Sequence, residues 1–534
     1  MDHFPPKKLA IPSIKTRLAL FLAATCFALP VSLQAQGNLQ NALPLLGDGS
    51  DMSASAERRL GDRIARELYR DPDMVDDPVL TDYVQGIWQP LLTAARARGD
   101  LTPELDERFA WRIVLGRDRS VNAFALPGGY FGLHLGLLAV VSSRDELASV
   151  LGHELSHVTQ RHISRLISKT GQQTPWMIGA MILGALAASK SPEAGNALIV
   201  GGQALAAQNQ LNFSRDMERE ADRVGFGVMT QAGFEAQGFV GMFDKLQQAA
   251  RLNDTGAYPY LRSHPLTTER MADMQSRLPL GAPHSVDVVP GMTHAMLTAR
   301  ARVLSNSGID ALRGWQARAD DAGLVSQAAA QQAGTLYGAA MAASRMRDVA
   351  QARKQWERLQ KVAAQEPEAA RQARWLGVEI ELAARDRSRP QVLALGGSIG
   401  LDPVSPVAVA QLRRPELLLQ AGVAMQAGQN WAMDRVTQSL QVWLVSQPQD
   451  ALAWQWLASL YAAQNQSLRA LRAEAEARVA QMDYAGALDR LKAAQDRLRA
   501  ASVSGTPEDH IEASIIDTRR RQIEALLKEQ ALES

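Results

Sequence analysis

Two histidines and a glutamate in the first third of the chain have the types and spacing of a metal-dependent hydrolase. Residues 153–157 read H-E-L-S-H, so His153 and His157 are four positions apart. On a helix their imidazoles share one face, and both can reach a single cation. Glu154 can lean over the same site without binding the cation, where it could polarise a water held by the metal. The pattern predicts zinc, although two histidines on a helix can also be packed or solvated without a metal.

The residues around this motif predict the helix that it requires. Ser143 and Glu146 have the S-x-x-E spacing of a capping box, which marks the beginning of a helix. A buried side is supplied by four apolar residues, Leu147, Val150, Leu151 and Val158. We expect residues 137–141 to continue into this capped helix. His162 lies nine residues beyond His153, half a turn away around what we expect to be the same helix, and is therefore excluded as a ligand.

A run of alternating charges at residues 214–225 contains candidates to complete the site. Glu218 and Asp222 are one helical turn apart, so both can face the same point. A zinc site with two histidines needs a third ligand, often a carboxylate from another helix, and Asp222 could hold the imidazole N–H of a ligating histidine. The alternative is a solvated helix face laced by salt bridges, which the charge pattern alone favours. Gly233 is expected to end this helix.

His264 is a further candidate, in the polar segment Ser263-His264-Pro265. Histidine before proline is not a helical packing position, so His264 is either an exposed loop residue or a reserve metal ligand. Arg270 and Tyr260, on either side of this loop, are candidates for stabilising the oxyanion of a tetrahedral intermediate.

Strands are expected just before the histidine motif. Residues 109–115 have β character, and residues 122–134 indicate a strand, a turn at Pro127-Gly128-Gly129, and a second strand. Proline is tolerated mainly at a free sheet edge, and a free edge beside a catalytic helix could bind a peptide as an added strand. An ordinary hairpin packed under the helix is an equally good interpretation. Helices are expected from Ala54 and around residues 83–91.

The N-terminus has the features of a secretory signal. A basic start and an apolar core at 18–33 precede small residues, and we expect cleavage after Ala35, with a membrane anchor as the alternative. Cys26, the only cysteine, follows a threonine, which is unlike a lipidation site, so the mature chain would have no disulfide. We therefore expect an exported, periplasmic protein. A net charge of +1 in 534 residues argues against nucleic-acid binding by bulk charge.

Composition shifts divide the chain into segments. We expect a signal peptide at 1–35, a flexible leader at 36–52, a zinc metalloprotease domain at 53–280, a linker at 281–292, a repeat domain at 293–505 and a capping helix at 506–534. The apolar runs at 176–188 and 197–207 are too short to span a bilayer. We interpret them as a helical hairpin that is buried over the site or rests on a membrane surface.

Helical patterns beyond the linker recur at about the spacing of tetratricopeptide repeats, roughly 34 residues. A first-helix pattern is carried by Trp454, Leu457, Ala458 and Tyr461. The small and large residues of second helices are expected at Ala352 with Trp356, at Ala470, and at Tyr484, Ala487, Leu491 and Ala494. Each match is weak by itself, but together they predict a helical repeat array.

Four motifs ahead of this array resemble those of the periplasmic β-barrel assembly-enhancing metalloproteases, which are related to membrane proteases of the HtpX type. They are H-E-L-S-H-V-T-Q-R-H at 153–162, E-R-E-A-D at 218–222, N-A-F-A-L-P-G-G at 122–129 and S-H-P at 263–265. The resemblance covers about residues 53–530 and is weakest in the repeats. It implies a mainly α protein: an α+β zincin-like domain, with an edge strand beside the H-E-x-x-H helix, followed by a solenoid resembling tetratricopeptide repeats.

The resemblance also implies the role of each site residue. One Zn²⁺ per chain would be held by His153, His157 and Glu218, with Glu154 as catalytic base and Asp222 supporting a ligand. The loop of His264 could place that imidazole on the metal and keep the enzyme latent.

The implied activity is that of a metalloendopeptidase that degrades misfolded or stalled outer-membrane proteins and supports their assembly. The repeats would contact the barrel assembly machinery, and peripheral membrane contact is compatible with the apolar runs. The alternative is a periplasmic chaperone or adaptor with structural zinc and little proteolysis, against which Glu154 argues because a structural zinc site has no use for it.

Overall fold

The computed structural model describes residues 52–169, 213–251, 258–279, 291–404, 407–501 and 507–532. Five segments for which the sequence makes predictions fall wholly or largely outside the described residues: the signal at 1–35, the leader at 36–52, the apolar runs at 176–188 and 197–207, and the linker at 281–292. In the part of the chain that is described, no helix combines the length and apolar character needed to cross a bilayer.

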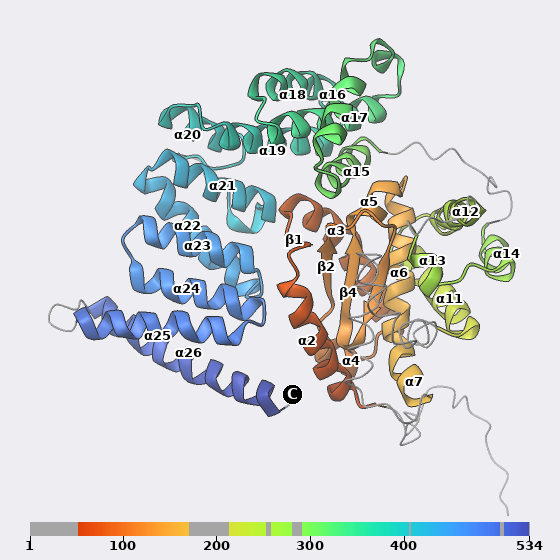
Figure 1. The fold of residues 1–534 in the computed structure, drawn as a ribbon, viewed down its shortest axis with the longest axis horizontal. Helices are drawn as coiled ribbons and strands as arrows, with labels where there is room; N and C mark the ends of the chain where they lie inside the picture. The colour runs from red at the N-terminus through yellow and green to blue at the C-terminus, as the bar shows by residue number, and fades with distance from the viewer. Residues whose placement is uncertain are drawn as a thin grey trace, which may run out of the picture. The chain divides into compact units, whose positions relative to one another are not determined.

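A four-stranded sheet forms the framework beside the histidine motif (Figure 1). Its order is β1-β2-β4-β3, with bounds Met74–Val75 for β1, Arg112–Gly116 for β2, Ala123–Leu126 for β3 and Tyr130–His134 for β4. β2 and β4 are parallel, while β1–β2 and β3–β4 are antiparallel. β3 is therefore an edge strand, and it contacts the helix of the histidine motif, as the sequence predicts.

The turn between β3 and β4 depends on two glycines. The 3-10 turn η1 (Pro127–Gly129) has φ of 71° at Gly128 and 80° at Gly129, in the left-handed region that L side chains rarely adopt. A Cβ on Gly128 would also lie 2.8 Å from the Cα of Arg58. The glycine pair thus lets the hairpin turn tightly against the helix α2 (Ala54–Arg70).

Three helices precede this hairpin. They are α2 (Ala54–Arg70), α3 (Pro78–Arg98) and the short α4 (Pro103–Arg108), so both helices expected before the strands are present. The side chains of Ser53 and Asp77 accept hydrogen bonds from the first turns of α2 and α3. Trp88 of α3 packs edge-on against Phe131 of β4, with ring centroids 4.6 Å apart, which fixes the helix to the sheet.

The histidine motif lies on α6 (Arg144–Thr159). Ser143 Oγ accepts a hydrogen bond of 3.1 Å from the Glu146 N–H, as the capping pattern predicts. The Glu146 carboxylate accepts from the Ser142 N–H instead of completing the box with Ser143. The expectation that residues 137–141 continue into this helix is wrong. They lie largely in a separate helix, α5 (Leu135–Val140), because the backbone at Val141 is extended.

A second break follows the motif. Arg161 has φ of 53°, and a new helix, α7, runs from His162 to Lys169. The expectation that His162 continues the same helix as His153 is therefore wrong. An ion pair of 3.0 Å between Arg161 and the buried Glu57 of α2 holds the chain at this break.

Four more helices belong to this half of the chain: α11 (Arg215–Gln231), α12 (Gln237–Arg251), α13 (Tyr260–Ser263) and α14 (Thr268–Ser276). α11 and α12 both pack against α6. Gly233, with φ of 86°, follows the end of α11, as predicted for a helix C-cap.

The rest of the described chain is helical, and most consecutive helices pack on one another (Figure 1). The helices are α15 (Met292–Ser305), α16 (Ile309–Asp320), α17 (Ala329–Arg345), α18 (Val349–Ala363), α19 (Pro367–Ala384), α20 (Arg389–Gly397), α21 (Arg414–Ala427), α22 (Asn430–Ser446), α23 (Ala451–Ala463), α24 (Ser467–Ala480), α25 (Tyr484–Ala501) and α26 (Pro507–Leu532), with short 3-10 turns η2 (Ala322–Ser326) and η3 (Val409–Gln411). Buried Tyr461 lies on α23 and buried Ala470 on α24, where the repeat pattern places them. The predicted fold class is thus confirmed: mainly α, with a small sheet beside the histidine helix and a helical region after it.

Polar and apolar side-chain contacts join this helical region to the first half of the chain. Arg300 of α15 is 3% exposed and forms two hydrogen bonds with Asp77, the N-cap of α3, of 2.8 and 2.7 Å. Arg414 of α21 pairs with Asp76 at 2.8 Å. Farther along, Met482 packs into the apolar cluster around Ile64 of α2. The described residues 52–532 therefore form one compact unit.

Candidate metal centre

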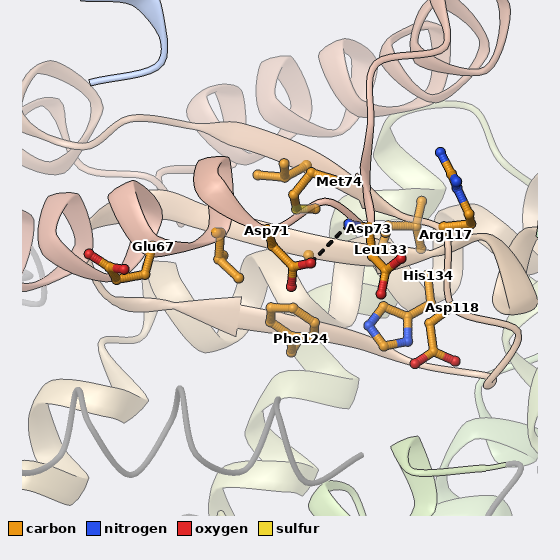
Figure 2. A pocket seen from close by; sticks show the side chains of 13 residues that line it. Glu67, Asp71, Asp73, Met74, Arg117, Asp118, Phe124, Leu133 and His134 are labelled. Atoms are coloured by element: carbon orange, nitrogen blue, oxygen red, sulfur yellow. Dashed lines mark hydrogen bonds between the residues drawn. The ribbon is translucent and has the colours of Figure 1, made fainter. Parts of the chain in front are cut away.

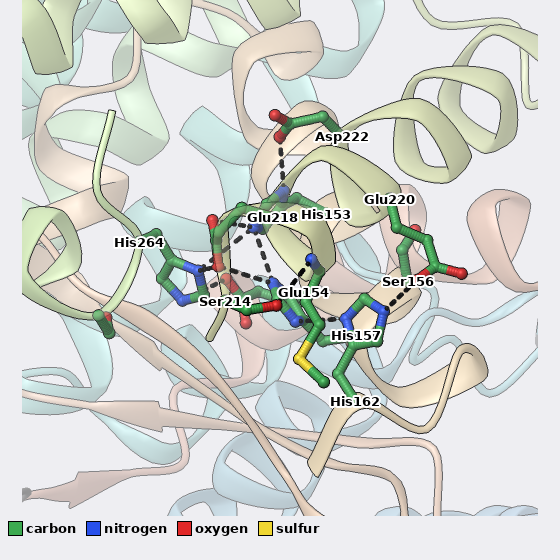
Figure 3. A network of polar contacts seen from close by, with 12 residues as sticks. His153, Glu154, Ser156, His157, His162, Ser214, Glu218, Glu220, Asp222 and His264 are labelled. Atoms are coloured by element: carbon green, nitrogen blue, oxygen red, sulfur yellow. Dashed lines mark hydrogen bonds and ion pairs between the residues drawn. The ribbon is translucent and has the colours of Figure 1, made fainter. Parts of the chain in front are cut away.

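Four side chains from three separate segments converge at one buried point (Figure 3). His153 and His157 come from α6, Glu218 from α11, and His264 from the end of α13. One donor atom from each lies within 4.8 Å of every other, and all four residues are buried. The sequence candidates for metal ligation are thus brought together.

The distances between these donors suit a tetrahedral zinc ion. His153 Nε2 lies 3.0 Å from His157 Nε2 and 3.3 Å from His264 Nδ1. Glu218 Oε1 lies 3.0 Å from His264 Nδ1 and 3.5 Å from His157 Nε2. Zinc–nitrogen bonds of about 2.0–2.1 Å in a tetrahedron would place neighbouring donors roughly 3.3 Å apart. The donor types and their spacing therefore fit the metal.

The electrostatics of the cluster also favour a cation. Burial disfavours a charged His153, but its hydrogen bonds to Asp222 and Glu218 outweigh this and raise the pKa of His153 to about 9. Burial would raise the pKa of Glu218, yet His264 and His153 hold that pKa well below its usual value. Burial, together with charge on His153, lowers the pKa of His157 well below normal. The carboxylates of Glu218 and Asp222 thus favour a positive charge at this point, while ionised Glu218 and neutral His157 are already in the forms that bind zinc.

A close helix crossing lets the carboxylates reach the histidines. Gly152 of α6 faces Gly225 of α11, and a Cβ on Gly225 would lie 2.9 Å from the Gly152 carbonyl carbon and from the His153 nitrogen. Any side chain at Gly225 would push the helices apart and withdraw Glu218 from the cluster. This glycine pair is the local feature that sets the distance between the two ligand-bearing helices.

Asp222 supports His153 from behind and is itself held by Arg270. Asp222 Oδ1 accepts a hydrogen bond of 2.9 Å from His153 Nδ1. This leaves Nε2 of His153 free to bind a metal at the point where the four donors converge, here called the metal point. Arg270 donates to both Asp222 oxygens, at 2.6 and 2.8 Å. Burial would raise the pKa of Asp222, but Arg270 and His153 overcome it and lower that pKa. The alternative interpretation of residues 214–225 as a wholly solvated helix face is therefore wrong at Asp222.

Arg270 also holds the loop that carries His264. Its Nη1 donates to the Pro265 carbonyl at 2.8 Å and lies 2.9 Å from Glu218 Oε2. All three guanidinium nitrogens are thus engaged within the scaffold of the site. Tyr260, the other candidate for oxyanion stabilisation, is buried with its ring centroid 4.6 Å from that of His264. His264 is buried, not an exposed loop residue.

Glu154 lies beside the cluster with unused hydrogen-bonding capacity. It is 1% exposed, and neither carboxylate oxygen has a hydrogen-bond partner among the described residues. The Nε2 atom of His264 lies 3.4 Å from Glu154 Oε1. A buried carboxylate without partners is costly, so Glu154 is a candidate for a function at the site.

Two residues of the site escape prediction from the sequence. His162 lies outside the four-donor cluster, but its Nδ1 lies 2.9 Å from Nδ1 of His157. Burial lowers the pKa of His162 to about 4. Phe213, just before α11, stacks on the His157 ring with centroids 3.9 Å apart. An aromatic residue directly before the S-R-D-M-E-R-E-A-D run is the sequence signal for this contact.

A separate cavity of about 140 Å³ lies where the end of α2 meets the sheet (Figure 2). It is lined in part by Phe124 and His134, and His134 Nδ1 lies 2.9 Å from Ser120 Oγ. None of the four converging donors lines this cavity. It is therefore not part of the metal centre.

Comparisons with known proteins agree with this geometry. The model of peptidase family M48 matches residues 93–278, which include all four donors. A relative from Vibrio cholerae is 35% identical over 300 residues, 56% of this chain and 58% of its own length. The chain thus matches less than two thirds of that relative. The mitochondrial metalloendopeptidase OMA1 of Saccharomyces cerevisiae is 27% identical over 201 residues, 37% of this chain and 55% of its own.

A longer match is found in Escherichia coli (strain K12). Its β-barrel assembly-enhancing protease is 30% identical over 447 residues, which are 82% of this chain and 83% of the relative. That match extends from the metal centre through most of the helical region. This chain is therefore a metallopeptidase of family M48 and belongs to the family of the β-barrel assembly-enhancing proteases.

Proposed function

We propose that this chain is a periplasmic zinc metalloendopeptidase that cleaves misfolded or stalled outer-membrane proteins and supports their assembly. The observation that carries the proposal is the buried cluster of three imidazoles and one carboxylate, next to a buried carboxylate that has no hydrogen-bond partner among the described residues. The substrate class rests on the names of the relatives, which describe proteases that enhance β-barrel assembly.

The residues divide into those that hold zinc and one that moves protons. His153, His157 and Glu218 would hold one Zn²⁺, and zinc in such a site polarises a peptide carbonyl and makes water more acidic. Glu154 then accepts a proton from the attacking water through a carboxylate oxygen and delivers it to the departing amine. No described residue hydrogen-bonds to its carboxylate, which supports this role because no such bond must first be broken.

His264 would act as a latch on this centre. Its Nδ1 points to the donor cluster and its Nε2 to Glu154, so its ring lies between the metal point and the base. In that position it takes the coordination place that substrate needs. Cleavage then requires the segment after α13 to move.

Arg270 and Asp222 would position ligands without touching substrate. Arg270 binds Asp222 with two nitrogens and Pro265 with the third. An arginine committed in this way cannot turn to an oxyanion without releasing Asp222. We therefore propose that Arg270 holds Asp222 and the loop of His264 in place. Tyr260 remains a candidate for oxyanion stabilisation.

The substrate would bind as an extended strand along β3. β3 pairs only with β4, leaves its other edge without a strand partner among the described residues, and contacts α6. An unfolded outer-membrane protein supplies extended segments of this kind. The helical region, which we interpret as resembling tetratricopeptide repeats, would contact the barrel assembly machinery.

The deciding experiment compares the wild-type protein with Glu154→Gln on a urea-denatured outer-membrane β-barrel protein diluted into buffer. We expect the wild type to contain one zinc and to cleave the unfolded barrel but not the folded one. Glu154→Gln should bind the unfolded barrel without cleaving it. Binding by both proteins with cleavage by neither would favour the chaperone or adaptor function instead.

A further inference from the structure

We propose that His162 positions the metal ligand His157, and that Glu220 fixes the proton on His162 so that it can do so. The chain of contacts runs from Glu220 through His162 to His157 and ends at the metal. This inference rests on the proposed zinc site and assigns a positioning residue that the ligand set does not include.

The contacts from Glu220 through His162 to His157 are continuous and largely buried (Figure 3). Nδ1 of His157 lies 2.9 Å from Nδ1 of His162, and Nε2 of His162 lies 3.1 Å from Glu220 Oε2. Both imidazoles are 0% exposed. Arg165 donates to the same Glu220 oxygen at 3.0 Å, so the outer end of the chain is anchored as well.

Only one arrangement of protons satisfies every contact when a metal is bound. Nε2 of His157 must offer its lone pair to the metal, so its Nδ1 carries the hydrogen. That hydrogen is donated to Nδ1 of His162, which must then be an acceptor. The single hydrogen of neutral His162 is therefore on Nε2, where the Glu220 carboxylate accepts it. Each group keeps one role, and none is left without a partner.

This arrangement differs from the support of the other histidine ligand. His153 donates directly to the carboxylate of Asp222, a common pattern for zinc-bound histidine. His157 instead donates to a neutral imidazole, and the carboxylate stands one residue farther away. The helix break at Arg161 makes this possible because it turns His162 back toward His157 instead of away from it.

Phe213 adds a steric reason for the arrangement. Its ring stacks on His157 at 3.9 Å between centroids, so one face of the imidazole is covered. The stacking contact sets the plane of the His157 ring, and His162 binds one edge of that ring. Nε2 of His157 is therefore held in one direction. Preorganised ligands of this kind raise metal affinity because less ordering is needed on binding.

The test measures zinc affinity by competition with a chelator, using the metal-free full chain and Zn²⁺ as the probe. We expect His162→Ala to bind zinc about 10–100-fold more weakly, as is typical when the partner of a ligating histidine is removed. His162→Asn should keep most of the affinity because Oδ1 of asparagine is the same number of bonds from Cα as Nδ1 of histidine. His162→Gln, whose oxygen is one bond farther out, should behave like His162→Ala.

Two outcomes overturn the proposal. Equal zinc affinity in His162→Ala and wild type would show that His162 does not support His157. Equal losses in the asparagine, glutamine and alanine variants would show that packing, not the accepted hydrogen bond, is what matters. Failure of the wild type to bind zinc would instead overturn the proposed zinc site, so the two failures are distinguishable. Thermal unfolding of each metal-free variant identifies a general loss of folding.

The role of Glu220 is tested independently in the same assay. Glu220→Gln retains an oxygen that can accept from His162 Nε2 and should bind zinc nearly as well as wild type. Glu220→Ala releases the proton of His162 to either nitrogen, so part of the population can no longer accept from His157, and zinc affinity should fall. Because Glu220 is partly exposed, both variants should fold. Equal affinity of Glu220→Ala and Glu220→Gln would show that Glu220 does not set the proton position.

Discussion

His264 Nε2 lies 3.4 Å from Glu154 Oε1, while Nδ1 of the same ring lies 3.0 Å from Glu218 Oε1. One imidazole therefore faces both the proposed metal point and the proposed base. A latch that only filled a coordination position would leave Glu154 accessible, whereas the latch proposed for His264 would cover both groups at once. Moving the segment after α13 would free the two groups together.

Replacing His264 with alanine should raise the basal rate of cleavage. If the latch is closed in about 90% of molecules, its removal raises the rate about tenfold, because the competent fraction rises to nearly one. Cleavage of an unfolded, fluorescently labelled substrate measures this rate, and zinc content should stay near one per chain. A His264→Ala protein as inactive as Glu154→Gln would show that His264 takes part in catalysis.

Each of the variants His153→Ala, His157→Ala and Glu218→Ala should lose bound zinc, because each removes one of the three ligands proposed for the catalytic site. Metal analysis after dialysis against dilute chelator measures the loss. His510→Ala is the matched control, since His510 is exposed on α26. Unchanged zinc content in Glu218→Ala would remove Glu218 from the ligand set.

Glu154→Gln should retain zinc and lose activity by at least about 10²–10⁴-fold, the usual contribution of general acid–base catalysis. The amide is nearly isosteric but cannot accept the proton. Neither oxygen of Glu154 has a hydrogen-bond partner among the described residues, so no structural network should be lost. The steady-state rate of peptide cleavage and the zinc content, measured on one preparation, separate the two effects. Turnover close to wild type would exclude Glu154 as the base.

Asp222→Ala should weaken zinc binding about 10–100-fold without abolishing it, since Asp222 holds His153 and is not among the four converging donors. If Asp222 formed only an exposed salt bridge, which contributes about 1 kcal/mol or less to stability, its removal should not change zinc affinity. Arg270→Ala should have a smaller effect of the same kind, because it removes the partner that holds Asp222. Chelator titration of both variants is the measurement, and wild-type affinity in Asp222→Ala would contradict the assignment.

Features set by neighbours in the sequence were predictable here. The spacing of His153 and His157 is a property of one helix, and so are the cap at Ser143 and the relation of Glu218 to Asp222. The hairpin turn at 127–129 likewise depends on its own proline and glycines. That His264 belongs with these residues came from the resemblance, because it meets His153 across 111 positions of sequence.

The errors arose where a distant contact determines a local conformation. Arg161 adopts φ of 53° without being glycine, and its ion pair with Glu57 lies 104 positions away in sequence. No local sequence signal indicates this helix break. The sequence therefore predicts one continuous helix, with His162 on the face opposite His153. Gly152 and Gly225 did carry usable information, since glycine within a helix often marks a close backbone approach.

Arg300→Ala should destabilise the protein, because Arg300 joins the helical region to the peptidase half. Besides its two bonds to Asp77, it donates to Glu379 at 2.7 and 2.8 Å and to the Tyr337 hydroxyl at 2.9 Å. Removing one partner of a buried ion pair costs about 3–5 kcal/mol, since charged groups are left buried and unpaired. The thermal unfolding midpoint, followed by circular dichroism, should fall clearly.

Two variants give this prediction its controls. Arg70→Ala removes the exposed Arg70–Glu67 pair, whose side chains are 57% and 49% exposed, and should change the midpoint little. Asp77→Asn retains an oxygen for the N-cap of α3 while removing the charge that Arg300 neutralises. Added to Arg300→Ala, it should therefore restore part of the lost stability, because the buried carboxylate is gone. If the double variant were as unstable as the sum of the two single variants, the two residues would not be coupled, and the clamp between the halves of the chain would have to lie elsewhere.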